Sequence, residues 1–217
     1  MQHQSADLEW RNGHIPVARR FDDPYFSLAD GLAETRHVFL GGNDLPARAR
    51  PGFHIAELGF GTGLNLLASL AALPDMPIRY TSFEGFPMSA PDMARALSAF
   101  PELDAGALVT AWASGARSFT LGQTQVEVII GDVATTLPAW AGRADAWYLD
   151  GFSPAKNPEM WAPEVMAEVA RHTQAGGTFA TYTAAGAVRR ALADAGFTVT
   201  RCPGFGRKRH MSKGVMP

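Results

Sequence analysis

A glycine-rich loop between a strand-like segment and a helix-like segment constrains the fold of this 217-residue chain most strongly. Residues 53–58 are typical of a buried strand, residues 59–63 have the sequence Gly-Phe-Gly-Thr-Gly, and leucines follow at helical spacing. Glycines at such a turn let the backbone approach a ligand, and the helix N-terminus presents N–H groups without partners. The loop lacks the G-x-G-x-x-G spacing of dinucleotide-binding proteins, which disfavours an NAD-dependent oxidoreductase, and no P-loop motif is present.

Strand-like and helix-like segments alternate from residue 53 onward. Strands are expected at residues 53–58, 78–83, 126–130, 145–149, 178–183, 197–201 and 211–215, and helices at 90–100, 102–112, 158–173 and 184–195. Residues 117–121 are expected either to pair with residues 126–130 as a hairpin or to form an edge strand. This order predicts a mostly parallel α/β sheet with helices on both faces.

The first 50 residues have a different pattern. Residues 8–11 and 14–18 flank Asn12-Gly13, which predicts a hairpin with a type I′ turn. A helix with Leu28, Leu32, Val38 and Phe39 on its apolar side is expected next, ended by the glycine pair at residues 41–42. We therefore predict one domain over residues 1–217, with residues 1–50 as an N-terminal hairpin-helix extension and residues 51–217 as a Rossmann-like core.

Composition excludes several classes of protein. A single cysteine, Cys202, excludes an intrachain disulfide framework and a cysteine-rich metal site, and no metal is expected. No signal peptide or membrane-spanning run is found, which predicts a cytoplasmic protein with no membrane partner. The net charge of −2 does not indicate nucleic-acid binding by the whole chain, so that role depends on a local basic patch.

Acidic residues stand at three predicted strand ends around the glycine loop. Glu57 precedes the loop, Glu84 ends the next strand, and Asp132 follows Gly131 after a later strand. The alternative is a tight strand–helix turn with no ligand. The arrangement resembles the class I S-adenosylmethionine-dependent methyltransferases, and the resemblance implies S-adenosylmethionine as cofactor. It implies these cofactor-binding residues: Glu57, Gly59, Phe60, Gly61, Thr62, Gly63, Asn65, Glu84, Gly131 and Asp132.

A second motif follows the strand at residues 145–149. Asp150 ends this strand, and the loop after it is bounded by glycine and proline and carries Phe152, Lys156 and Asn157. An amine nucleophile must be unprotonated, so a carboxylate that orients the amine and takes its proton suits methyl transfer. Position alone leaves an alternative open, in which Asp150 only forms an Asx-turn or a helix N-cap.

Residues 145–161, DAWYLDGFSPAKNPEMW, resemble the tRNA methyltransferases that complete 5-methylaminomethyl-2-thiouridine at the wobble position. This family comprises MnmD and the methyltransferase half of bifunctional MnmC proteins. The resemblance runs over roughly residues 8–216, in blocks at residues 21–45, 57–67, 82–87, 176–197 and 204–211. Two positions depart from it: Gly85 stands where we expect lysine, and His210 where we expect an acidic residue.

The resemblance implies transfer of a methyl group from S-adenosylmethionine to the exocyclic amine of 5-aminomethyl-(2-thio)uridine, with the tRNA anticodon loop as partner. A separate flavin-dependent oxidoreductase is expected to supply the aminomethyl precursor. Asp150 is the expected catalytic residue. The expected substrate-binding residues are Tyr25, Phe152, Lys156, Asn157, Arg207, Lys208 and Arg209.

Two alternatives remain open from the sequence. The chain could methylate a small-molecule amine with the same cofactor loop, or it could be a non-catalytic RNA-binding module. The basic run at residues 207–209 lies in a stretch without acidic residues after Asp194, and such a run is often only a solvated tail.

Overall fold

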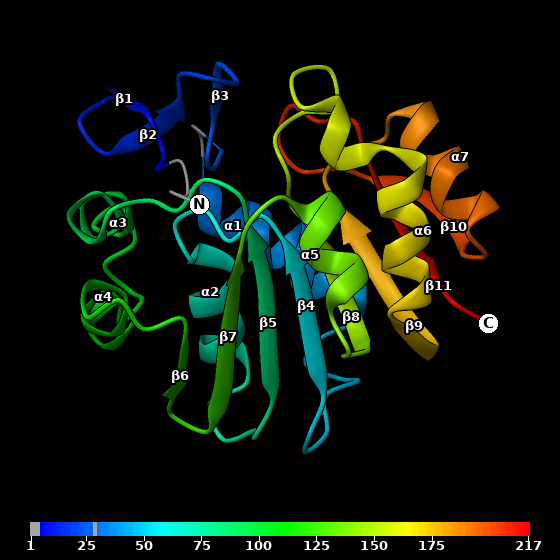
Figure 1. Ribbon diagram of the computed structural model, residues 1–217, viewed down its shortest axis with the longest axis horizontal. Coiled ribbons are helices and arrows are strands. Elements are labelled where there is room, and N and C mark those ends of the chain that lie inside the picture. The colour runs from blue at the N-terminus through cyan, green and yellow to red at the C-terminus, as the bar shows by residue number, and fades with distance from the viewer. Residues whose placement is uncertain (1–4, 28–29) are drawn as a thin grey trace.

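The computed structural model describes residues 5–27 and 30–217. Its main sheet has eight strands in the order β10-β11-β9-β8-β4-β5-β7-β6 (Figure 1). Neighbouring strands from β9 to β7 are parallel, whereas β11 and β6 are antiparallel to their neighbours, so the predicted mostly parallel sheet is confirmed. The strands are β4 (His54–Leu58), β5 (Arg79–Glu84), β6 (Ser118–Leu121), β7 (Thr124–Ile130), β8 (Ala144–Leu149), β9 (Thr173–Thr181), β10 (Thr198–Pro203) and β11 (His210–Val215).

Helices cover both faces of this sheet, as predicted (Figure 1). Each face has its own apolar cluster, because successive side chains of a strand point to opposite faces. Trp147 and Tyr148 of β8 illustrate this, since both are fully buried but belong to different clusters. The helices are α2 (Leu64–Ala72), α3 (Ala90–Leu97) and α4 (Gly106–Ala113) on one face, and α5 (Val133–Ala139), α6 (Pro163–Arg171) and α7 (Gly186–Asp194) on the other.

The chain changes direction across the sheet at β4. This strand pairs with β5 on one side and with β8 on the other. Loops that leave two such neighbouring strands in opposite directions open a crevice at the carboxyl ends of the strands, where α/β proteins bind ligands. Here the two loops touch: a Cβ on Gly59 (φ 92°) would lie 2.6 Å from the carbonyl oxygen of Asp150. Only glycine fits at this position.

The N-terminal residues form a small sheet of β1 (Leu8–Arg11), β2 (Ile15–Ala18) and β3 (Asp23–Pro24), which lies near the carboxyl edge of the main sheet (Figure 1). Asn12 and Gly13 have the positive φ values that the hairpin prediction requires, 51° and 79°. The predicted two-residue turn is wrong, however. Arg11 pairs with Ile15, which leaves His14 in a three-residue loop.

The helical segment that follows is less regular than predicted. Helix α1 (Gly31–Thr35) begins after Asp30, whose side chain accepts a hydrogen bond from the Ala33 N–H at 2.8 Å. It continues as a π-helix, η1 (Arg36–Leu40), and a 3₁₀ turn, η2 (Gly41–Asn43). Gly41 is the C-cap of η1, as the prediction expects, but the 3₁₀ turn carries the helical segment on through Gly42 to a left-handed residue, Asp44. Leu28 lies outside the described residues.

Two further helix predictions need correction. The single helix over residues 158–173 is instead a 3₁₀ helix, η3 (Pro158–Trp161), followed by α6. The break falls at Ala162, which is extended because Pro163 disfavours a helical residue before it. Helix α5 was not predicted, since its threonines and Pro138 are poor helix formers. Within the described ranges, no helix is both long and apolar enough to cross a membrane.

Candidate active site

A cavity of about 1360 Å³ lies at the carboxyl ends of β4, β5, β7 and β8. Pockets for one drug-sized ligand have volumes of about 300–1,000 Å³, so this cavity has room for two ligands side by side. The glycine loop, the N-terminal extension, the loop after β8 and the loop between β10 and β11 all contribute to its wall. Six of the predicted cofactor residues on or near the glycine loop and β5 line it: Gly59, Phe60, Gly61, Thr62, Asn65 and Glu84.

Glu84 connects the end of β5 to the glycine loop. Its Oε2 accepts a hydrogen bond from the Gly61 N–H at 2.8 Å, and its Oε1 accepts one from the Phe86 N–H at 2.7 Å. Burial raises the pKa of Glu84, and these N–H donors oppose the rise. Each carboxylate oxygen has two lone-pair sites, so Glu84 can still accept hydrogen bonds from the hydroxyls of a ligand in the cavity.

Gly131 and Asp132 lie at the end of β7 and also line the cavity. The Gly131 N–H donates to the backbone oxygen of Glu84 at 2.9 Å, so the two strand ends are joined. Asp132 caps α5, because its Oδ1 accepts from the Ala134 N–H at 2.9 Å. A helix N-cap was the alternative role for Asp150. The structure places such a cap at Asp132, which also lines the cavity.

Gly63 does not line the cavity. It begins α2 with a φ of 80°, and a Cβ there would lie 2.7 Å from the Leu108 side chain. The structure thus does not bring Gly63 to the cavity with the other predicted cofactor residues, and it shows that this glycine is needed for the turn and for close packing.

Glu57 is likewise buried behind the loop, with an exposed fraction of 0%. Its Oε1 accepts from the Asn65 side-chain amide at 2.8 Å, and its Oε2 accepts from the Ser82 hydroxyl at 2.7 Å. The structure therefore does not place Glu57 on the cavity wall, where the prediction expects it. Glu57 holds Asn65, whose Nδ2 also donates to Asp150 Oδ2 at 2.7 Å. Thr35 fixes the orientation of this amide by donating to Asn65 Oδ1 at 2.9 Å.

Asp150 is partly buried at the end of β8 and lines the cavity. Burial raises its pKa to about 7, and the hydrogen bond from Asn65 opposes the rise. The charge of Glu34 raises this pKa further, and that of Lys208 lowers it. Burial also raises the pKa of Glu57 to about 8. A carboxylate with a pKa near neutrality is suited to accept a proton from a reacting group.

Aromatic rings form the wall beside Asp150. Phe152 stacks on Phe21 with ring centroids 4.7 Å apart, and the ring of Tyr25 meets it edge-on at 5.0 Å. Tyr25 lies over the glycine loop, 3.1 Å from the place that a Gly61 Cβ would take. Asn157 also lines the cavity. The predicted residues Tyr25, Phe152 and Asn157 are thus brought together with Asp150.

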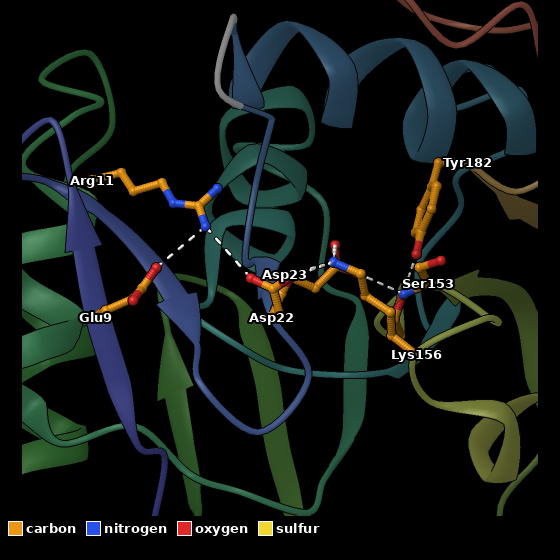
Figure 2. Close-up of polar contacts among 8 residues, drawn as sticks. Glu9, Arg11, Asp22, Asp23, Ser153, Lys156 and Tyr182 are labelled. Carbon is orange, nitrogen blue, oxygen red and sulfur yellow. Dashed lines mark hydrogen bonds and ion pairs between the residues drawn. The ribbon is translucent and has the colours of Figure 1, made fainter.

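Lys156 is not part of this wall. Its ammonium group donates to the backbone oxygen of Asp22 and lies 3.7 Å from the Asp23 carboxylate. Asp23 also accepts from the Ser153 N–H at 2.8 Å. Figure 2 shows Lys156 and Ser153 facing the two aspartates. The structure does not place Lys156 on the cavity wall, where the prediction expects it, and its charge instead holds the loop after β8 against the N-terminal extension.

The basic run at residues 207–209 is divided by the structure. Arg207 and Lys208 line the cavity, whereas Arg209 is exposed and does not. Lys208 points inward, and its Nζ lies 2.7 Å from Glu34 Oε1. Glu34, which is buried on α1 and lines the cavity, was not selected by any sequence pattern.

Residues 105–217 match the model of a family described as S-adenosyl-L-methionine-dependent methyltransferase. The chain belongs to this family of methyltransferases. Its cofactor is accordingly S-adenosyl-L-methionine. The residues found here suit that molecule, since the Glu84 carboxylate can accept hydrogen bonds from ribose hydroxyls and the glycine loop lines the same cavity.

Curated relatives of this methyltransferase carry the name tRNA 5-methylaminomethyl-2-thiouridine biosynthesis bifunctional protein MnmC. The protein from Pseudoalteromonas atlantica is 43% identical over 240 residues, covering 100% of this chain and 34% of the relative. The protein from Chromobacterium violaceum is 45% identical over 237 residues, covering 99% of this chain and 35% of the relative. The chain spans about a third of the length of these relatives.

Solved structures support the methyltransferase fold. The crystal structure of MNMC2 from Aquifex aeolicus superposes with a TM-score of 0.79 at 22% identity, covering 100% of this chain and 72% of the other. A spermidine synthase complex superposes with a TM-score of 0.59 at 12% identity, covering 97% and 72%. The predicted class I methyltransferase fold is confirmed.

Proposed function

We propose that this methyltransferase acts on tRNA and methylates the exocyclic primary amine of 5-aminomethyl-(2-thio)uridine at the wobble position, giving 5-methylaminomethyl-(2-thio)uridine. The observation that carries the proposal is the position of Asp150. Asn65 donates a hydrogen bond to the Asp150 carboxylate, the backbone carbonyl of Asp150 lies against Gly59 of the glycine loop, and Asp150 lines the cavity together with the aromatic residues. The names of the MnmC relatives, which align over nearly all of this chain, support this choice of substrate.

The glycine loop, Glu84, Gly131 and Asp132 would hold the cofactor. S-adenosylmethionine supplies a methyl group activated by a sulfonium centre. The chain's own residues must exclude water and hold the amine in line with that methyl group, and positioning alone can contribute about 7–11 kcal/mol to lowering the barrier. The cluster of Phe21, Tyr25 and Phe152 is suited to both tasks.

Asp150 would orient the substrate amine and take its proton. Asn65 donates to Oδ2, and in the proposal Oδ1 accepts the hydrogen bond from the amine. The proton moves from the amine nitrogen to Asp150, which leaves the nitrogen lone pair directed at the methyl carbon. Because burial raises the pKa of Asp150 to about 7, its carboxylate can both accept and release this proton near neutral pH.

The aromatic wall would receive the uracil ring. Stacking of a base on an aromatic side chain contributes about 1–3 kcal/mol. The anticodon loop would lie over the loop between β10 and β11, where Arg207 and Arg209 are exposed. Enzymes that modify a base commonly take it out of the stack, which suits a deep cavity of this kind.

The remaining expectations form part of the same proposal. We propose that residues 1–217 act as one methyltransferase domain, in which residues 5–27 and 30–50 of the N-terminal extension cover the acceptor side. A flavin-dependent oxidoreductase, separate or fused, would supply the aminomethyl precursor, since the relatives are described as bifunctional. The enzyme would then act in the cytoplasm, where its tRNA substrate is found.

Mass spectrometry of wobble nucleosides tests the proposal. The protein is incubated with S-adenosylmethionine and tRNA bearing 5-aminomethyl-2-thiouridine, and the expected result is the gain of one methyl group on that nucleoside. The same tRNA with unmodified uridine serves as the negative control. Methylation of free alkylamines at a comparable rate, without tRNA, would instead favour a small-molecule methyltransferase. Binding without any turnover would favour a non-catalytic RNA-binding module.

A further inference from the structure

The cavity contains an ion pair that the proposed chemistry has not used. Glu34 on α1 and Lys208 on the loop between β10 and β11 are 174 residues apart, yet Lys208 Nζ lies 2.7 Å from Glu34 Oε1. The Glu34 side chain is only 11% exposed, whereas that of Lys208 is 44% exposed. The carboxylate is therefore fixed in the wall, and the ammonium group reaches it from an accessible loop.

The surroundings of the Lys208 ammonium are those of a binding site for an alkylammonium ion. Its Nζ lies 4.1 Å from the ring centroid of Tyr182, within the range of a cation–π contact. The Tyr182 hydroxyl donates to the backbone oxygen of Gly151 at 2.7 Å, which fixes the ring beside Asp150. Glu34, Lys208 and Asp150 all line the cavity, and the charges of Glu34 and Lys208 both affect the pKa of Asp150.

We propose that Glu34 is a second carboxylate for the substrate amine, and that Lys208 occupies the site of the substrate ammonium until the substrate enters. This inference rests on the proposed function, because it assumes an aminomethyl group as the ligand. A lysine side chain and an aminomethyl group end in the same –CH₂–NH₃⁺ unit. The two can therefore exchange on Glu34 and the Tyr182 ring without leaving the buried carboxylate unpaired.

Glu34 would act twice in the reaction. It binds the amine in its charged form, from which Asp150 removes one proton to give the neutral nucleophile. As the N–C bond forms and the C–S bond breaks, with its electron pair going to sulfur, positive charge develops on the nitrogen. A carboxylate beside that nitrogen stabilises the charge where it develops. The product leaves as a secondary ammonium ion, and Lys208 returns to Glu34.

This role differs from the phosphate contact that the basic run suggested, and the two make opposite predictions for Lys208. If Lys208 competes with the substrate, Lys208→Met should strengthen binding of aminomethylated tRNA relative to unmodified tRNA. If Lys208 binds a phosphate, the same substitution should weaken binding of both tRNAs equally.

The experiment measures Kd for two tRNAs that differ only at the wobble base, 5-aminomethyluridine or uridine, using protein loaded with S-adenosylhomocysteine so that no turnover occurs. For wild type we expect tighter binding of the aminomethylated tRNA. Lys208→Met should increase this preference several-fold. Glu34→Gln should reduce it by roughly tenfold, the usual effect of losing a charged hydrogen bond. Glu34→Asp should retain part of it.

Lys213→Met is the matched control for loss of positive charge. Lys213 is also partly exposed and pairs with a carboxylate, Asp44, at 3.6 Å, but it does not line the cavity. Its removal should change both Kd values by the same factor. Thermal unfolding of each variant identifies any loss of folding. If Glu34→Gln does not fold, Glu34→Asp is compared with wild type in its place.

Three results would overturn the inference. Wild type could bind both tRNAs equally, or Glu34→Gln could keep the preference of wild type for the aminomethylated tRNA. The third is that Lys208→Met weakens binding of both tRNAs by the same factor, and by more than Lys213→Met does. Failure of the proposed function is distinct, since it appears as absence of methylation of the aminomethylated tRNA by wild-type protein.

Discussion

The two sides of the cavity are built in different ways. On the cofactor side, Glu84 and the glycine loop are joined through backbone N–H groups close to strand ends. On the acceptor side, the contacts join segments far apart in the chain, such as Asp23 with Ser153 and Glu34 with Lys208. The cofactor side is therefore specified by local sequence, whereas the acceptor side depends on how the N-terminal extension folds back over the sheet.

Asp150 lies where the two sides meet, and its loss should have the largest effect. Asp150→Asn keeps the size of the side chain and an acceptor for the Asn65 amide, but removes the group that takes the proton. We expect turnover on aminomethylated tRNA to fall by about 10²–10⁴-fold. The Kd for S-adenosylmethionine should stay within about twofold, because the glycine loop is unchanged. Turnover within a few-fold of wild type would contradict the catalytic role.

The same substitution should stabilise the protein at alkaline pH. Burial raises the pKa of Asp150 from 3.8 to about 7, so the folded protein binds more protons than the unfolded chain between these values. Asp150 therefore makes its full contribution to the free energy of unfolding of wild type below about pH 4. This contribution is lost as the pH rises through 7, and the loss is at most about 4 kcal/mol. Burial raises the pKa of Glu57 to about 8, so ionisation of Glu57 lowers the stability further up to about that pH.

Urea unfolding at pH 5 and pH 8 measures this effect. Wild type should lose stability over the interval, and Asp150→Asn should lose less, because its side chain does not ionise. Asp23→Asn, on the other side of the wall, is a matched carboxylate-to-amide control. Equal pH dependence of wild type and Asp150→Asn would contradict the raised pKa.

The cofactor side can be tested separately at Glu84. Both of its carboxylate oxygens accept backbone N–H groups, but glutamine has only one acceptor oxygen. In Glu84→Gln, one N–H therefore faces an NH₂ group, and we expect the Kd for S-adenosylmethionine to rise by about tenfold or more. Asp132→Asn keeps its acceptor for the Ala134 N–H and should show a smaller loss. Isothermal titration calorimetry without tRNA distinguishes the two.

This division between the two sides also explains what the sequence could predict. The mostly parallel sheet, the glycine loop and the acidic strand ends follow from local patterns, and the structure agrees with them. Gly63 and Glu57 lie behind the cavity wall, which could not be predicted, because a motif does not tell whether a residue lines a cavity or supports one that does. The position of Lys156 outside the cavity wall could not be predicted, because its partners lie in the N-terminal extension, more than 130 residues earlier.

Glu34 and Thr35 were not selected from the sequence, although both act on the site. They lie in an ordinary amphipathic stretch, where an acidic residue and a threonine usually face solvent. Only the tertiary fold brings Thr35 onto Asn65 and Glu34 onto Lys208. The one available signal was that they belong to the N-terminal block that resembles the tRNA methyltransferases.

The contact between Lys156 and the aspartates should matter only for the acceptor side. Lys156 is 38% exposed, and ion pairs in such positions contribute about 0–1 kcal/mol. Lys156→Met should therefore raise the KM for tRNA by no more than about fivefold, with the Kd for S-adenosylmethionine unchanged. Ser153 still donates its N–H to Asp23, which limits the effect. A change in cofactor affinity would show that the two sides are coupled through this loop.

The smallest effect is expected at the exposed arginines of the loop between β10 and β11. Arg207 and Arg209 are free to reach phosphates, whereas Lys208 is paired with Glu34. Each phosphate contact changes the slope of log K against log salt by about 0.7–0.9. Replacing both arginines by alanine should therefore reduce the slope by at most about 2, and adding Lys208→Ala should not reduce it further. A slope that falls in three equal steps would place all three cations on the RNA backbone and contradict the inward role of Lys208.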